Sequence, residues 1–323
     1  MKVPTASSEA QLEQLRREAE LNGRVDRPGI RPAGSPFPQA TSENGYYGLP
    51  LLKPPVWTWE VPTYFFVGGM GGAAAVIGAM ARISGADPKL VRDARWAAAV
   101  AANVSTPLLI ADLGRPSRFL NMLRIFKPQS PMSVGAWIVA AFGGASTAAI
   151  IFPRRLADLF AFTSAALGLG MSTYTGVLLG ATAIPVWSEH KRLLPIHFGA
   201  SAVASAASTL ELMGNDQKAL HYLAVGAAAV EICVTAPSHP LIRLGGILSG
   251  PVPLALRLIR GRSSRVRRAA ALISLAGSLI TRFAWVAAGK ENARAYTAAT
   301  DRVDDMRSGS ENRNPIPQVS SER

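Results

Sequence analysis

The chain has 323 residues, of which 49% are hydrophobic and only 17% are charged. Soluble globular proteins usually carry about 25% charged residues, so the composition favours a membrane-embedded helical protein. The net charge of +13 does not indicate nucleic-acid binding, because most basic residues lie near the termini and between apolar runs, where lipid headgroups favour them. We therefore expect membrane lipid, and no nucleic acid, among the partners.

The chain begins with a polar tail over residues 1–55. It opens with a charged stretch, so we expect no cleavable signal peptide. A short helical pattern covers residues 8–21, and a proline-rich stretch follows Gly23. Such a stretch does not form a long helix and is expected to lie extended over a surface or a partner.

Eight apolar segments follow, each near the roughly 20 residues that cross about 30 Å of hydrocarbon as a helix. The seventh is the weakest, because Pro251 and Pro253 interrupt it, and a broken or re-entrant segment is an open alternative there. The pattern predicts an all-α integral membrane protein with a transmembrane domain over residues 56–290 and a polar C-terminal tail over 291–323, disordered or bound to a partner. The segments cover 61–83, 94–113, 132–152, 157–184, 194–213, 219–236, 241–259 and 269–288.

Charged residues inside a bilayer are costly and are functional candidates by default. With eight spans, both tails share one face of the membrane, here called the tail face. Counting along the spans places five polar residues in the half of the membrane near this face, whereas Tyr174 lies nearer the middle of its span. The five are Glu60, Asp112, His197, Glu231 and Arg282.

Structural explanations for these residues stay open beside the functional ones. Glu60 and Asp112 could serve only as helix caps at the water interface. His197 could be an ordinary packed histidine whose ring nitrogens are hydrogen-bonded in the core. Arg282 either extends its charge toward the membrane surface or forms a buried ion pair, most simply with Glu231. We interpret this last pair as steps of a proton path.

The segment between the second and third spans, residues 112–133, holds an acid, three arginines and several large apolar side chains. This mixture predicts a short interfacial helix that presents its arginines to lipid headgroups or to an acidic partner.

Several of these motifs together resemble the polysulfide reductase NrfD-type family of membrane subunits. The resemblance covers most of residues 47–290. It rests on Pro55-Val56-Trp57-Thr58-Trp59-Glu60-Val61-Pro62-Thr63-Tyr64-Phe65-Phe66 with the following glycines, Asp112-Leu113-Gly114-Arg115-Pro116, Arg118-Phe119, Ser130-Pro131-Met132-Ser133-Val134-Gly135, Trp137, Tyr174-Thr175-Gly176-Val177-Leu178-Leu179, Pro185-Val186-Trp187 and Thr281-Arg282-Phe283-Ala284-Trp285.

The resemblance implies eight spans arranged as two four-helix bundles in a bacterial inner membrane. It implies a quinone as cofactor, menaquinone or ubiquinone, with no haem in this chain. Cys233 is the only cysteine, so cysteines of this chain alone cannot ligate an iron–sulfur cluster. The resemblance also implies two partners, a four-cluster ferredoxin-like iron–sulfur subunit that docks over the quinone site and a molybdopterin-type catalytic subunit. The chain would be the quinone-reactive part of an oxidoreductase that is not catalytically complete alone.

Matching the motifs residue by residue implies quinone-site or proton-handling roles for Glu60, Asp112 and Tyr174. Tyr64 and Arg115 fall within the same motifs and are further candidates for quinone binding. Arg282 matches an arginine of the family's polar interior. His197 departs from the family pattern, which favours an apolar residue there, and it is kept as a candidate quinone ligand.

Elementary chemistry agrees with a quinone site and leaves three other functions open. A carboxylate accepts a proton and a tyrosine donates a hydrogen bond to a carbonyl oxygen, as quinol oxidation requires. A haem-b anchor would need paired histidines inside the membrane. A proton or ion transporter would use the internal charges and the broken seventh span. A purely structural anchor would bind no quinone.

Overall fold

The computed structural model of the chain describes residue 52 and residues 55–113, 117–234, 239–260 and 263–311, and all regular structure in these ranges is helical. The helices are α2 (Glu60–Ile83), α3 (Pro88–Asp112), α4 (Ser117–Arg124), α5 (Pro131–Ile151), α6 (Arg154–Gly180), α7 (Pro185–Ser188), α8 (Leu193–Leu212), α9 (Lys218–Val234), α10 (Pro240–Ser249), α11 (Pro251–Arg260) and α12 (Ser264–Glu311).

Local sequence explains where several of these helices begin. Pro88 and Pro131 occupy the first position of α3 and α5, where a missing N–H costs nothing. The side chain of Asp87 accepts a hydrogen bond from the Lys89 N–H at 2.8 Å and caps α3. The Ser130 hydroxyl caps α5 in the same way, because it accepts a hydrogen bond from the Ser133 N–H.

A single helix covers the main part of seven of the eight predicted segments, and the seventh segment is divided into two ten-residue helices, α10 and α11. Gly250 ends α10 because it precedes Pro251, and a residue before proline disfavours the helical conformation. Within the described ranges, six helices are long and apolar enough to span a membrane, counting α10 and α11 together as one. The others fall short because α9 has only 17 residues, and α3 carries Lys89, Arg92, Asp93 and Arg95 near its start.

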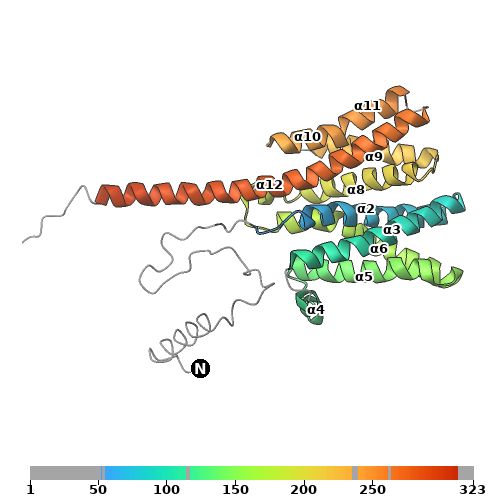
Figure 1. Cartoon of the computed structure of the whole chain (residues 1–323), viewed down its shortest axis with the longest axis horizontal. Helices are drawn as coiled ribbons and strands as arrows, with labels where there is room; N and C mark the ends of the chain where they lie inside the picture. Colours follow the sequence, from blue (N-terminus) through green and yellow to red (C-terminus); the bar gives the residue numbers. More distant parts are fainter. Residues whose placement is uncertain (1–51, 53–54, 114–116, 235–238, 261–262, 312–323) are drawn as a thin grey trace, which may run out of the picture.

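The helices pack in two groups that meet along α2 and α8 (Figure 1). The first group contains α2, α3, α5 and α6, and the second contains α8, α9, α10, α11 and α12. Helix α8 contacts both α2 and α6, and α12 also contacts α2. The quinone-site candidates of the first group therefore lie beside the polar candidates of the second.

Small residues allow the closest helix contacts. A Cβ built on Gly72 would lie 2.6 Å from the Gly168 carbonyl oxygen, so α2 and α6 touch backbone to backbone there. In the second group, a Cβ on Gly277 of α12 would lie 2.3 Å from the Ser249 backbone nitrogen. Such contacts are typical of helices that pack in lipid, where van der Waals contact drives association. The glycines at positions 68, 69, 71 and 72 are therefore explained by close contacts between α2 and its neighbouring helices.

Helix α12 continues well beyond the predicted segment end at residue 288. It remains helical to Glu311 and projects out of the helical body at the tail face, where α2 begins and α3 ends (Figure 1). The expectation of disorder after residue 290 is therefore corrected to a continuous helix as far as Glu311, whereas the binding of this region to a partner stays a prediction. The N-terminal helical pattern over residues 8–21 lies outside the described residues.

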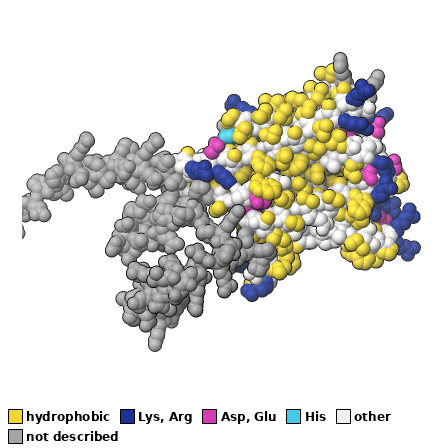
Figure 2. Space-filling view, in the orientation of Figure 1, with side chains coloured by type: hydrophobic (Ala, Val, Ile, Leu, Met, Phe, Trp, Pro, Cys, Tyr) yellow, Lys and Arg dark blue, Asp and Glu magenta, His cyan; other side chains and the backbone are white. Residues whose placement is uncertain are grey.

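The surface of the helical body is divided by residue type. Hydrophobic side chains cover its middle, and Lys and Arg side chains gather at its two ends (Figure 2). Exposed large hydrophobic residues such as Ile151, Leu169 and Ile247 belong to this apolar surface. This distribution fits a multi-pass membrane protein, with the apolar middle facing lipid and the charged ends at the two interfaces.

Candidate functional site

A small cleft of about 50 Å³ opens within the first helix group near the tail face. Helices α2, α3, α5 and α6 all contribute to its walls, and the segment before α2 adds Trp57. Three of the predicted site residues, Tyr64, Asp112 and Tyr174, lie in it together. The lining residues are Trp57, Val61, Tyr64, Phe65, Leu109, Asp112, Leu113, Met122, Met132, Gly135, Ala136, Tyr174 and Leu178.

The position of Tyr174 depends on a glycine across the cleft. A Cβ built on Gly135 of α5 would lie 1.9 Å from the Tyr174 hydroxyl oxygen, so only glycine leaves space for this ring. Tyr174 is 8% exposed and lies in the last two turns of α6, closer to the tail face than its sequence position suggested, because α6 ends at Gly180. The hydroxyl group is thus held in the cleft by packing.

A threonine not identified from the sequence joins the two carboxylates of the site. The Thr58 hydroxyl donates to Glu60 Oε2 and lies 3.4 Å from Asp112 Oδ1, and the Thr58 backbone N–H also donates to Asp112 Oδ1 at 3.4 Å. Glu60 is partly exposed at the start of α2, whereas Asp112 faces the cleft. Thr58 therefore connects a carboxylate in the cleft with one at the surface.

The segment before α2 is fixed by residues of α7 and α12. The Lys290 ammonium group donates a hydrogen bond to the Trp57 carbonyl oxygen and attracts Asp112 electrostatically. The Trp57 ring stacks on Trp187, with centroids 5.5 Å apart and planes inclined by 18°. The Trp187 indole N–H in turn donates to the Trp285 carbonyl oxygen at 2.8 Å. The second helix group thus positions one wall of the cleft.

A second polar cluster lies in the interior of the second helix group. Arg282 is 1% exposed, and its guanidinium group lies 3.9 Å from the Phe198 ring centroid and donates to the Phe198 carbonyl oxygen at 3.0 Å. Glu231 is fully buried and interacts electrostatically with Arg282, with Ser201 and Ser249 beside its carboxylate. The charge pair predicted from depth alone is thus brought together.

His197 belongs to this second cluster and not to the cleft. Its ring is 2% exposed, lies next to Phe198 and Trp285, and interacts with the charge of Arg282. Neither ring nitrogen has a hydrogen-bond partner among the described residues. Similar membrane depth did not imply contact with the cleft, because α8 presents this residue to α12.

Buried polar residues continue from this cluster along one side of α8 toward the opposite face of the membrane. Residues spaced three or four apart share one side of a helix, and those on this side are His197, Ser201, Ser205, Ser208 and Glu211. Ser201 donates to Ser278 of α12 at 2.9 Å. At the far end, Arg257 donates to Glu211 at 2.7 Å and to Ser208 at 3.3 Å, and its side chain is only 1% exposed.

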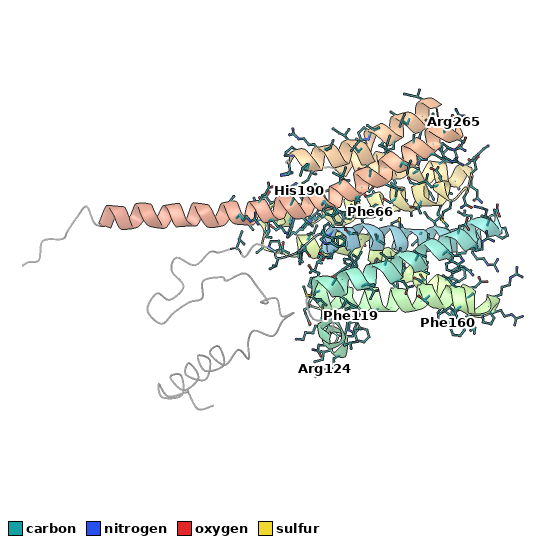
Figure 3. The ribbon with its side chains drawn as sticks, viewed as in Figure 1. Phe66, Phe119, Arg124, Phe160, His190 and Arg265 are labelled. Carbon is teal, nitrogen blue, oxygen red and sulfur yellow. The ribbon has the colours of Figure 1, made fainter. Side chains whose placement is uncertain are left out.

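The segment predicted to form an interfacial helix lies at the end of the helical body from which α12 projects (Figure 1). A short helix, α4, forms in this segment and carries Phe119 and Arg124 (Figure 3), and its contact with lipid headgroups or an acidic partner stays a prediction. Arg115 lies outside the described residues. His190 lies near the end of the helical body from which α12 projects, and Arg265 lies at the other end (Figure 3). Within the described ranges, no group of three or more His, Cys, Asp or Glu residues could hold a metal ion.

Comparison with known families agrees with this arrangement. A family model described as polysulfide reductase, of the NrfD type, matches residues 43–242. The match covers more than half of the chain and includes every helix that lines the cleft. The chain belongs to the polysulfide reductase NrfD family. No curated protein matches it.

Membership of the NrfD family makes this chain a membrane subunit of a redox complex. The matched region ends at residue 242, so it contains Glu231 but neither Arg257 nor Arg282. Sequence reasoning missed Thr58 and Lys290, which hold Asp112 and Trp57 in place. The Pro55–Glu60 motif contains Thr58 but gives no indication of its partners, and Lys290 comes from the far end of the chain.

Proposed function

We propose that this chain is the quinone-binding membrane subunit of a multi-subunit respiratory oxidoreductase and exchanges electrons with a docked iron–sulfur subunit. The observation that carries the proposal is the cleft in which Tyr174, Tyr64 and Asp112 meet between apolar walls. Quinone recognition needs such walls together with a few polar groups that fix the carbonyl oxygens.

The donors and acceptors of the cleft fit a quinone, whereas its present volume requires side chains to move. The tyrosine hydroxyls supply hydrogen-bond donors, and Asp112 supplies a proton acceptor. The cleft of about 50 Å³ is smaller than the several hundred Å³ typical of ligand pockets. Two of its walls are formed by Met122 and Met132, whose unbranched side chains adapt readily to a ligand.

A bound quinone would supply two-electron, two-proton redox chemistry, and the residues of this chain would position it and handle its protons. Tyr174 would donate a hydrogen bond to one carbonyl oxygen. Asp112 would accept a proton, and Thr58 would link it to Glu60 at the surface. This sequence of groups gives protons a route from the cleft to the tail face.

The same proposal includes the arrangement of the complex. The eight segments would cross a bacterial inner membrane as two four-helix bundles, one for each packing group. The iron–sulfur subunit would dock on the tail face, close to the cleft, against α4 and the projecting part of α12. A molybdopterin-type catalytic subunit would bind beyond it. Electron transfer needs a short distance between the cleft and the nearest iron–sulfur cluster, which this placement would provide.

Substitution of Tyr174 tests the quinone site. In Tyr174→Phe the ring remains but the donor is lost, which is worth about 0.5–1.5 kcal/mol. We expect quinone affinity to fall about twofold to tenfold while the complex still assembles. Tyr222→Phe is the matched control, because Tyr222 is 68% exposed on α9. Unchanged affinity in Tyr174→Phe, or an equal loss in the control, would contradict the proposal.

We propose a second activity, proton conduction, for the buried polar column of the second helix group. The column joins Arg282 and Glu231 near the tail face to Arg257 and Glu211 near the opposite face. The Ser205 hydroxyl, between them, is buried and has no hydrogen-bond partner among the described residues. Water molecules commonly bridge such buried polar groups inside proteins. Polar residues linked in this way inside a membrane can form a proton relay.

Proteoliposomes test this second activity separately from quinone binding. Ser205→Val replaces the hydroxyl and one Cβ hydrogen by two methyl groups in the middle of the column, and we expect proton movement across the vesicle membrane to slow. Thr163→Val is the control, because Thr163 is exposed on α6 and bonds only its own helix. Equal proton movement in wild type and Ser205→Val would leave the column a packing feature and leave the quinone site unaffected.

A further inference from the structure

A basic groove lies on the opposite face of the membrane, far from the cleft. It is formed where α2 ends, α3 begins, α5 ends and α6 begins, and its volume is about 630 Å³. Four arginines and one aspartate supply its charged groups. They are Arg82, Arg92, Arg95, Arg154 and Asp158.

The one acid in the groove is already engaged by two of the arginines. Arg82 donates to Asp158 through Nη2 at 3.0 Å, and Arg95 also donates to it. Arg92 has only a 3.6 Å contact with Asp93, a carboxylate that Lys89 binds more closely at 2.7 Å. The groove therefore keeps a net positive charge, and Arg92 is 66% exposed in it.

Arg154 adds a second available positive charge. It is exposed at the start of α6 and forms no ion pair with a described residue. The turn between α2 and α3 also lines the groove and passes through Gly85, which adopts φ +67° and has no neighbouring atom within 4 Å of the position of a Cβ. Gly85 therefore leaves its part of the groove open, and the groove volume of about 630 Å³ is ample for a phosphate group.

Below the arginines, the groove continues into apolar surface that faces lipid. Trp96 and Phe152 line it and are 49% and 46% exposed, and Ile150 lies beside them. Aromatic side chains are favoured at the depth where headgroups meet acyl chains. One site therefore offers positive charge at the membrane surface and an apolar wall directly beneath it.

We propose that this groove binds an anionic phospholipid, with its phosphate at Arg92 and Arg154 and its acyl chains along Trp96 and Phe152. Basic pockets between transmembrane helices suit such headgroups. The apolar wall distinguishes a lipid from free phosphate, which would use only the arginines. Arg82 and Arg95 are both paired with Asp158, so this cluster holds the walls of the groove together and does not bind the lipid phosphate.

Native mass spectrometry of the purified full-length protein in detergent tests the proposal. Phosphatidylglycerol is titrated against wild type and the Arg92→Gln/Arg154→Gln variant, which changes exposed residues only. Each arginine near a membrane surface contributes about fivefold to anionic lipid binding, so the double variant should bind about 25-fold more weakly. Arg265→Gln/Arg268→Gln is the charge-matched control, since both residues are exposed on the same membrane face in α12.

Three outcomes would overturn the proposal. The first is equal phosphatidylglycerol binding by wild type and the groove variant. The second is an equal loss in the α12 control, which would mean that general surface charge attracts the lipid. The third is equally tight binding of phosphatidylcholine, or displacement of phosphatidylglycerol by inorganic phosphate at equal concentration, since either result excludes selective capture of an anionic lipid.

Discussion

The ring of Tyr174 occupies the space that a side chain on Gly135 would fill, with 1.9 Å between the Tyr174 hydroxyl oxygen and an ideal Cβ on Gly135. The two residues belong to α6 and α5, and both line the cleft. A glycine in the first turns of a membrane helix lowers helix propensity by about 1 kcal/mol relative to alanine. Here it makes room for the hydroxyl group that we assign to quinone binding.

Gly135→Ala should therefore damage the cleft without removing any of its polar groups. The new methyl group would force Tyr174 aside, and such overpacking typically costs about 1–3 kcal/mol. We expect lower thermal stability and about tenfold weaker quinone binding. Gly144→Ala, in the same helix, is the control, because its Cβ would meet nothing within 4 Å. A Gly135→Ala protein that binds quinone as tightly as Gly144→Ala would show that Tyr174 does not need its present position.

The hydroxyl group of Thr58 should matter more than its size. Thr58→Val keeps the shape but removes the donor that connects Glu60 and Asp112. A hydrogen bond of this kind contributes about 0.5–1.5 kcal/mol, so quinol oxidation should slow about twofold to tenfold. Thr58→Ser keeps the hydroxyl and should retain most of the rate. Steady-state turnover of the complex measures both, and equal rates for the two variants would exclude a role for the hydroxyl.

Glu231 and Arg282 should behave as a coupled pair. Removing one partner of a buried charge pair strands the other and costs about 3–5 kcal/mol. We expect Glu231→Gln and Arg282→Gln each to lower assembly, and the double variant to recover part of the loss. The yield of folded complex from membranes gives the double-mutant cycle. Strictly additive losses would mean that the two residues act independently.

Gly289 of α12 should influence the cleft from a distance. A Cβ at this position would lie 1.9 Å from the Trp187 ring, which stacks on Trp57 in the cleft wall. Gly289→Ala should shift both rings and weaken quinone binding by a few-fold, a smaller effect than that of Gly135→Ala. Gly226→Ala on α9 is the control, with no atom within 4 Å of its Cβ. Quinone titration followed by tryptophan fluorescence measures the effect, and unchanged affinity would show that Trp57 is not positioned through Trp187.

The sequence alone predicted the long helices, because the thickness of the bilayer sets the number of apolar residues that a membrane-spanning helix needs. It singled out the seventh segment, interrupted by Pro251 and Pro253, as the one where a break was an open alternative, and proline explains the break because it lacks an N–H and restricts the residue before it. Depth along each span also predicted that Glu231 and Arg282 lie at one level. These features depend on local composition or on counting residues from a known boundary.

The sequence did not predict which side chains of different helices would contact one another. Depth placed His197 level with the cleft residues, but the rotation of α8 turns it toward Arg282. The Thr58 link and the Lys290 contact with Trp57 depend on which segments meet in space. The length of α12 was underestimated because its apolar run ends near residue 288, whereas a helix needs no apolar side chains once it leaves the lipid.

Photo-crosslinking with an azido-quinone tests the central claim most directly. The purified protein is labelled with the reagent, digested, and the labelled peptides are located by mass spectrometry. The account predicts label on peptides that line the cleft in α2, α5 and α6, competed by excess unlabelled quinone and reduced in Gly135→Ala. Label that is absent, resists competition, or falls mainly on α8 and α12 around His197 would contradict it.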